Sequence, residues 1–267
     1  MKLTRFAAYS ASFALAGTLA LTGAGAAGAA QKAQAVDYVA LGDSYSSGVG
    51  AGSYDGSSCK RSSKAYPALW AARNAPATFK FAACSGARTG DVTSSQLGSL
   101  SSATDLVSIT VGGNDAGFAD VMTTCVLQGE AACIRRVNQA RAYVDSTLPG
   151  QLDSVYNGIK AKAPAARVVV LGYPRFYKIN GTCSVGLSEK SRTAINNASD
   201  YLNTATAKRA ADHGFAFAGV AAAFSGHEIC TPTPWLHSLN WSNIGESYHP
   251  TAAGQSGGYL PVMNSAA

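Results

Sequence analysis

A serine in a glycine-containing turn is the first residue that could do chemistry. Ser44 follows a short apolar run and lies in a Gly-Asp-Ser sequence, which would expose its hydroxyl where a strand ends. Alone, it is more simply a helix N-cap. Two more apolar runs end in glycine turns, one carrying Gly86 and the other Asn114. In neighbouring parallel strands, the N–H groups of Ser44 and Gly86 and the amide of Asn114 could converge on one point. Such uncharged donors would stabilise an oxyanion, as acyl transfer requires.

A serine hydroxyl becomes an effective nucleophile only with a base beside it, and His249 is the candidate base. It lies in the sequence Glu-Ser-Tyr-His-Pro, with the carboxylate of Glu246 three residues before it. Either that carboxylate or an intervening main-chain carbonyl can fold back onto Nδ1, which leaves Nε2 to take the proton from Ser44. The other histidines fit structural or surface positions better than catalysis: His213, His227 and His237.

Short apolar runs alternate with longer helical stretches along the chain. The runs are largely apolar, as in parallel strands buried on both faces, and span residues 38–41, 79–83, 106–111, 168–172 and 215–220. Helices are predicted over residues 65–74, 119–126, 134–162 with a break near Pro149, and 188–213 with Ser188 as N-cap and Gly214 past the end. This alternation predicts an α/β fold: a doubly wound parallel sheet of strand order 2-1-3-4-5 with helices on both sides.

The N-terminal segment has the layout of a secretory signal peptide. A short basic start precedes an uncharged apolar stretch, residues 6–30, and small-x-small cleavage sites end at Ala29 and Ala35. A retained membrane anchor is the alternative, because the stretch is long enough to span a bilayer. Cleavage is favoured because the stretch is rich in Ala and Gly rather than Leu. We therefore expect a signal peptide over residues 1–35, a mature chain that begins near Val36, and one domain over residues 36–267.

Composition and cysteine content restrict the partners of the chain. Only 13% of the residues are charged and the net charge is +6. Because the Lys and Arg residues are not clustered, a nucleic-acid partner is not expected. Six cysteines in an exported chain favour three disulfides. Nearest-neighbour pairing would pin surface loops, but the sequence does not choose among the pairings. There is no C-x-x-C pair, so a zinc or thioredoxin-type site is not expected.

Taken together, the four segments resemble the conserved blocks of the GDSL/SGNH hydrolase family, in the family's order. They read GDSYSSGVGAG, CSGARTGDV, SITVGGNDAGF and SYHPTAAGQ, and closely resemble secreted lipases and esterases from actinobacteria. The family's serine, glycine, asparagine and histidine correspond to Ser44, Gly86, Asn114 and His249. The resemblance implies a three-layer α/β/α sandwich around a parallel five-stranded, flavodoxin-like sheet. It also implies hydrolysis of carboxylic esters without a metal or organic cofactor.

The resemblance further implies roles for the cysteines and for the residues before the histidine. It supports sequential disulfides: Cys59 with Cys84, Cys125 with Cys133, and Cys183 with Cys230. The family usually has Asp three residues before the histidine, where this chain has Glu246. Some actinobacterial relatives instead hold the histidine through a main-chain carbonyl, here that of Ser247. We favour a Ser44–His249 dyad oriented by Ser247, with Glu246 as the competing third member.

These features predict a secreted serine esterase or lipase that hydrolyses fatty-acid esters, such as acylglycerols or phospholipids, through an acyl-serine intermediate. The alternatives are a carbohydrate acetylesterase of the same family and a non-catalytic secreted binding module. Five apolar residues could line an acyl groove or pack in the core: Phe118, Phe176, Tyr177, Leu236 and Trp241. After signal cleavage we expect a monomer that does not insert stably into a membrane.

Overall fold

The structure describes the mature part of the chain that the sequence predicts. The computed structural model describes residues 36–183 and 186–267. The predicted signal peptide, residues 1–35, lies outside the described residues, so it stays a prediction. Within residues 36–183 and 186–267, no helix has both the length and the hydropathy of a transmembrane span.

The sheet has five parallel strands in the predicted order. The strands are β1 (Asp37–Gly42), β2 (Thr78–Phe81), β3 (Leu106–Thr110), β4 (Arg167–Leu171) and β5 (Ala216–Ala218). Their order is β2-β1-β3-β4-β5, and all neighbours run parallel. β1 and β3 are buried almost throughout, which explains why their sequences are apolar rather than alternating. This order places the turn after β1 between the turns after β2 and β3.

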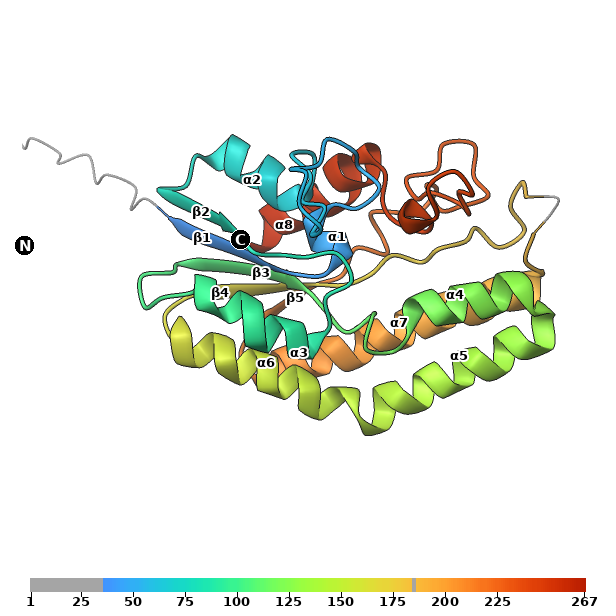
Figure 1. Cartoon of the computed structure of the whole chain (residues 1–267), viewed down its shortest axis with the longest axis horizontal. Coiled ribbons are helices and arrows are strands. Elements are labelled where there is room, and N and C mark those ends of the chain that lie inside the picture. The colour runs from blue at the N-terminus through green and yellow to red at the C-terminus, as the bar shows by residue number, and fades with distance from the viewer. Residues whose placement is uncertain (1–35, 184–185) are drawn as a thin grey trace, which may run out of the picture. The chain divides into compact units, whose positions relative to one another are not determined.

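Helices cover both faces of the sheet and complete a three-layer α/β/α sandwich. They are α1 (Ser44–Ser47), α2 (Tyr66–Asn74), α3 (Thr89–Asp91), α4 (Phe118–Leu127), α5 (Gly129–Ser146), α6 (Leu148–Lys162), α7 (Glu189–Asp212) and α8 (Leu260–Ala266). In Figure 1, α2 and α8 lie on one face of the sheet, while α3, α6 and α7 lie on the other. α4 packs along α5, and α5 packs along α7.

Local signals set the ends of the long helices. The predicted break occurs between α5 and α6, and Pro149 lies in the first turn of α6, where its missing N–H costs nothing. Ser188 caps α7, because its hydroxyl accepts a hydrogen bond from the N–H of Ser191 at 3.2 Å. Gly214 follows the helix with φ +72°, as predicted for a residue just past a helix end. α5 begins at Gly129, earlier than the predicted residue 134.

The C-terminal region is more helical than the sequence predicts. A π-helical segment, Gly254–Tyr259, leads directly into α8. The sequence predicts no helix here because the segment is rich in Gly and Ser, which are weak helix formers. Packing supplies the stabilisation: the side chains of Tyr259 and Met263 are fully buried. The Tyr259 hydroxyl also donates a hydrogen bond to the carbonyl of Gly172 at 2.9 Å.

The six cysteines form the three disulfides that the family resemblance implies. The pairs are Cys59–Cys84, Cys125–Cys133 and Cys183–Cys230. The first joins the loop between α1 and α2 to the turn after β2, the second joins α4 to α5, and the third joins the loops after β4 and β5. Each restricts the unfolded chain and contributes about 2–4 kcal/mol to the free energy of unfolding.

Candidate active site

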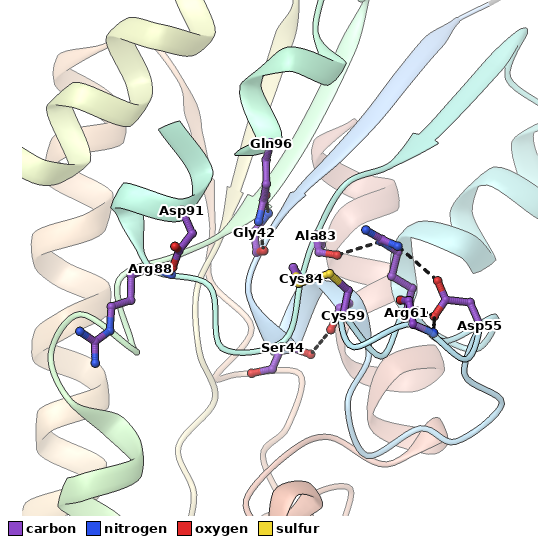
Figure 2. Close-up of a disulfide and its surroundings, with 12 residues drawn as sticks. Gly42, Ser44, Asp55, Cys59, Arg61, Ala83, Cys84, Arg88, Asp91 and Gln96 are labelled. Carbon is purple, nitrogen blue, oxygen red and sulfur yellow. Dashed lines mark hydrogen bonds and ion pairs between the residues drawn. A yellow bond between two sulfur atoms is a disulfide. The ribbon is translucent and has the colours of Figure 1, made fainter. Parts of the chain in front are cut away.

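The turn after β1 holds Ser44 in a fixed position. Gly42 has φ +121°, and a β-carbon there would lie 2.4 Å from the carbonyl oxygen of Thr110, so only glycine fits. The buried side-chain amide of Gln96 accepts from the N–H of Gly42 at 2.7 Å and donates to its carbonyl at 2.9 Å. Figure 2 shows Gln96 directed at this residue. Ser44 then begins α1, with Asp43 as its N-cap.

The structure brings Ser44 and His249 into hydrogen-bond contact. Nε2 of His249 lies 2.7 Å from Oγ of Ser44. Nδ1 of the same ring lies 3.0 Å from the carbonyl oxygen of Ser247. The carboxylate of Glu246 faces elsewhere, since it accepts a hydrogen bond from the hydroxyl of Tyr54 at 2.7 Å. Of the two groups predicted to orient the histidine, the main-chain carbonyl therefore has the better geometry.

The loop that carries His249 is fastened by side-chain and backbone hydrogen bonds rather than by regular structure. Tyr248 has φ +66°, an unusual conformation for a residue with a side chain. The hydroxyl of Tyr45 donates to the Tyr248 carbonyl at 2.7 Å. The N–H of His237 donates to the His249 carbonyl at 2.9 Å, and Nε2 of His237 lies 2.8 Å from the Gly50 carbonyl. His237 therefore has a structural role: it connects the loop that carries His249 to the segment after α1.

The three predicted oxyanion donors line one groove together with the histidine. Ser44, Gly86, Asn114 and His249 all face this groove. Gly86 has φ +79°, and its N–H has no protein acceptor in the described part of the chain. One N–H of the Asn114 amide donates to the Ala87 carbonyl at 3.0 Å, which fixes the amide and leaves the other N–H available.

A disulfide and an arginine hold the turn that carries Gly86, the glycine predicted to donate to the oxyanion. Cys84 is bonded to Cys59, and the N–H of Ser85 donates to the Cys59 carbonyl at 3.0 Å. The guanidinium of Arg61 donates to the Ala83 carbonyl at 3.0 Å. Figure 2 shows this disulfide and Arg61 beside the end of β1. The disulfide therefore supports the site as well as the fold.

Asp43 has no role predicted from the sequence, yet its buried carboxyl connects the ends of three strands. It accepts hydrogen bonds from the N–H of Tyr45 at 3.0 Å, the hydroxyl of Thr110 at 2.6 Å and the hydroxyl of Tyr173 at 2.5 Å. Tyr173 in turn accepts from the N–H of Gly113 at 3.2 Å. Burial raises the pKa of Asp43 to about 6. The sequence signal for this role is the position of Asp43 between an apolar strand and Ser44. A carboxylate buried at such a position needs several hydrogen-bond donors, so neighbouring strand ends can be expected to supply them.

The environment of His249 favours the neutral ring. Removal from water lowers the pKa of His249 to about 4, against the opposing effect of the Ser247 carbonyl. The nearby His237 and Lys60 lower the pKa of His249 further. At neutral pH the imidazole is therefore unprotonated and able to accept a proton from Ser44.

An apolar pocket opens at the serine. It reaches from Ser44 and Asn114 into the space between α4, α5 and α7. Apolar side chains dominate its wall: Phe118, Met122, Val144, Phe176, Ile195 and Leu202. A pocket of this composition suits a hydrocarbon chain attached to the ester that Ser44 attacks.

Of the five apolar residues predicted either to line a groove or to pack in the core, the structure places some at the site and others in the core. Phe118 and Phe176 line the apolar pocket, and Trp241 lines the groove. Leu236 and Tyr177 are buried and line neither of these spaces. Those two residues belong to the core.

Two further histidines have structural positions away from the groove. His213 follows the last turn of α7, as predicted, and its Nε2 lies 3.0 Å from a carboxylate oxygen of Asp153. The ring of His227 stacks on that of Trp235 with a centroid separation of 3.7 Å. Neither histidine lines the groove that contains Ser44.

A serine and a histidine in contact at the edge of a five-stranded α/β sheet, beside uncharged donors, define the class of serine-type ester hydrolases. Comparison with known proteins agrees. The sequence profile of the GDSL-like lipase/acylhydrolase family matches residues 40–256, and the chain belongs to this family. It is accordingly a carboxylic ester hydrolase.

Proteins from Streptomyces share about two thirds of their residues with this chain. Lipase 1 of Streptomyces coelicolor is 67% identical over 269 residues and covers 100% of both chains. The crystal structure of an extracellular lipase from Streptomyces rimosus has a TM-score of 0.85 and 68% identity, and covers 87% of this chain and 100% of that one. The crystal structure of phospholipase A1 from Streptomyces albidoflavus has a TM-score of 0.86 and 69% identity, with the same coverage.

Proposed function

We propose that the chain is a secreted lipase or esterase that hydrolyses carboxylic esters of fatty acids through an acyl-serine intermediate on Ser44. The observation that carries the proposal is the 2.7 Å contact between Ser44 and His249 at the mouth of an apolar pocket. The apolar wall of that pocket, formed by α4, α5 and α7, offers contacts to a hydrocarbon chain that an acetyl group is too short to make. The pocket therefore favours fatty-acyl esters over a carbohydrate acetylesterase.

In the first half-reaction, neutral His249 accepts the Ser44 proton through Nε2 while Oγ attacks the ester carbonyl. The carbonyl of Ser247 accepts the Nδ1–H and so stabilises the imidazolium that forms. The N–H groups of Ser44 and Gly86 and the Asn114 amide donate to the oxyanion. The tetrahedral intermediate collapses, the alcohol leaves with the proton from Nε2, and an acyl-serine remains.

The second half-reaction reverses these roles with water. His249 removes a proton from a water molecule as its oxygen attacks the acyl carbonyl, and the same donors bind the second oxyanion. The imidazolium then returns the proton to Ser44 as the fatty acid leaves. These residues supply the base, the nucleophile and the oxyanion donors.

Three observations support the proposal that the chain is exported. Residues 1–35 have the layout of a signal peptide, and all six cysteines are paired, as is typical of oxidising compartments. The similar lipase of Streptomyces rimosus is described as extracellular. We infer a monomeric mature enzyme that begins near Val36, which N-terminal sequencing and ultracentrifugation of the secreted product would test.

The chain-length preference tests the proposed substrate. The mature chain should hydrolyse p-nitrophenyl esters of medium or long acyl chains faster than the acetyl ester. Ala198→Leu, which adds bulk to the pocket wall, should shift the optimum toward shorter chains. Ala205→Leu, on the same helix but outside the pocket, is the matched control. A maximum at acetyl would favour the acetylesterase.

The nucleophile is tested separately. Ser44→Ala should abolish hydrolysis of every ester in the series, because no other hydroxyl contacts Nε2 of His249 in the described part of the chain. Circular dichroism should show an unchanged fold. Retained turnover in this variant would refute the assignment of Ser44, and no turnover by the unaltered chain would favour a binding module.

A further inference from the structure

Large hydrophobic side chains gather on the rim of the catalytic groove. Within residues 36–183 and 186–267, four such side chains are strongly exposed: Leu127 (65%), Ile179 (36%), Trp241 (73%) and Ile244 (59%). All but Ile179 line the groove that contains Ser44 and His249. Exposed hydrophobic side chains that cluster in this way mark a surface that meets another apolar surface.

The surroundings of these side chains carry little charge. Residues 239–245 contain no charged side chain, and Glu246 next to them is bonded to Tyr54. Asp120, on the same helix as Leu127, pairs with Arg136. The Nζ of Lys60 lies 3.3 Å from the place where a β-carbon on Gly245 would stand.

Lys60 adds a positive charge beside residues 239–245, which carry none. In the described part of the chain, no carboxylate lies within 4.0 Å of its ammonium group. An ammonium group beside exposed Trp and Ile side chains matches the interface of a phospholipid bilayer. There, phosphate groups lie above the acyl chains and tryptophan settles between the two.

We propose that Leu127, Trp241 and Ile244 form a docking rim that seats the enzyme on a phospholipid bilayer, with Lys60 contacting lipid phosphate. The inference rests on the proposed function, because docking through this rim would bring the groove that leads to Ser44 onto a membrane surface whose lipids carry the ester. A second copy of the chain is a poorer occupant, since a protein seated on the rim would cap the groove and exclude substrate. The docking is shallow and reversible, as expected for a few exposed apolar side chains.

Vesicle binding can be measured without turnover in a Ser44→Ala background. The probe is a vesicle of phosphatidylcholine and phosphatidylglycerol whose acyl chains carry bromine, which quenches tryptophan fluorescence at short range. Trp70 is 7% exposed and Trp235 stacks on His227, so Trp241 should account for most of the quenching. Trp241→Phe should still bind vesicles in sedimentation but lose the quenching. Quenching that persists in this variant would contradict docking through the rim.

The strength of docking is tested by removing apolar side chains in the same background. Trp241→Ser, and Leu127→Ser with Ile244→Ser, should each weaken vesicle partitioning by about tenfold. Lys60→Gln should weaken partitioning by a smaller factor, and adding salt to the unaltered rim should do the same. Ile179→Ser is the matched control, because it removes an exposed apolar side chain outside the groove. Rim variants that partition like Ile179→Ser would overturn the proposal.

The outcomes separate this proposal from the proposed function. Normal hydrolysis of p-nitrophenyl esters without vesicle binding would overturn docking alone. Vesicle binding by a chain that hydrolyses no ester would overturn the proposed function alone. Ultracentrifugation tests whether a second copy of the chain binds the rim instead of a bilayer. A dimer that dissociates on Trp241→Ser would overturn docking on a bilayer in favour of self-association.

Discussion

The two sides of the Ser44–His249 pair are held in different ways. Ser44 stands at the buried edge of a parallel sheet, where the strand register fixes its turn against those of Gly86 and Asn114. His249 lies in an irregular loop after β5, which is held by an isolated bridge between Leu236 and Pro250 and by side-chain hydrogen bonds such as that from Tyr45 to Tyr248. The comparison indicates that the fold sets the positions of the proposed nucleophile and oxyanion donors, whereas a few separate contacts set the position of the proposed base.

The difference has a physical cause. Parallel strands align their carboxyl ends at one edge, so residues distant in sequence meet there without special contacts. A loop has no such register, and each backbone angle must be fixed individually. The positive φ of Tyr248 shows this, since the surrounding contacts must offset its strain. Substitutions on the two sides should therefore affect different steps.

Removal of the base should have the largest effect. His249→Ala should lower kcat by about 10⁴ or more, because Ser44 loses both its general base and the acid that protonates the leaving group. Steady-state kinetics on a p-nitrophenyl ester measure the loss, and thermal unfolding serves as the control for the fold. A loss below about a hundredfold would exclude His249 as the base.

Removal of an oxyanion donor comes next. Asn114→Ala should lower kcat by about 10²–10³ with a smaller change in KM, because the amide binds charge that develops only in the transition state. Asn114→Asp is a useful second variant, since a carboxylate would repel the oxyanion. A loss of tenfold or less in the alanine variant would argue against this role.

On acidification, the activity should fall only at an unusually low pH. With the pKa of His249 lowered to about 4 by burial, the fraction of active enzyme at pH 5 is about 30-fold higher than for an ordinary histidine. The unfolded chain takes up this proton near pH 6.5, so the free energy of unfolding decreases as the pH falls from about 6.5 to 4. Asp43 acts in the opposite direction, because burial raises its pKa to about 6.

The kcat/KM profile of the free enzyme reports this pKa. An apparent pKa of 6 or above would contradict the lowering of the His249 pKa by burial. Thermal unfolding at each pH shows whether the activity is lost before the fold. The profile is to be recorded with a soluble short-chain ester, so that lipid packing does not change with pH.

Loosening the histidine loop should have a moderate effect. Tyr45→Phe removes the hydroxyl that donates to the Tyr248 carbonyl while keeping the aromatic packing, and should lower kcat by about tenfold through misplacement of His249. The acid limb should move toward pH 6.5 as the ring gains water. Unchanged kinetics would show that other contacts suffice to hold the loop.

The smallest effect is expected at Glu246. Glu246→Ala should lower kcat by less than about threefold, because the carboxylate bonds to Tyr54 while the Ser247 carbonyl holds Nδ1. Glu246→Gln retains a partner for Tyr54 and separates loss of charge from loss of that bond. A loss near 10⁴ would instead establish a carboxylate triad.

Much of the fold could be predicted from the sequence. Residues 106–111 and 168–172 are apolar because both faces of their strands are covered, and the structure places β3 and β4 there. Ser44, Gly86 and Asn114 lie in the turns after three of the predicted strands, so it could also be predicted that these residues line one groove. These features depend on local pattern and on the regular geometry of parallel sheets.

What could not be predicted depends on contacts between distant residues. Tyr45 and Tyr248 are 203 positions apart, and nothing in either segment indicates their bond. The sequence leaves Glu246 and the Ser247 carbonyl as competing partners of the ring and favours Ser247 only through the family resemblance. The bond between Tyr54 and Glu246, which occupies that carboxylate, could not be predicted. The π-helical segment Gly254–Tyr259 forms because Tyr259 is buried, which overrides the weak helix propensity of the glycines in this segment.

Covalent labelling tests the central claim most directly. A fluorophosphonate reacts with a serine only where a base and an oxyanion site activate it, and peptide mapping identifies the labelled residue. The account predicts one adduct per chain, on Ser44. An adduct on another serine, such as the exposed Ser256, or no adduct on an active enzyme, would contradict it.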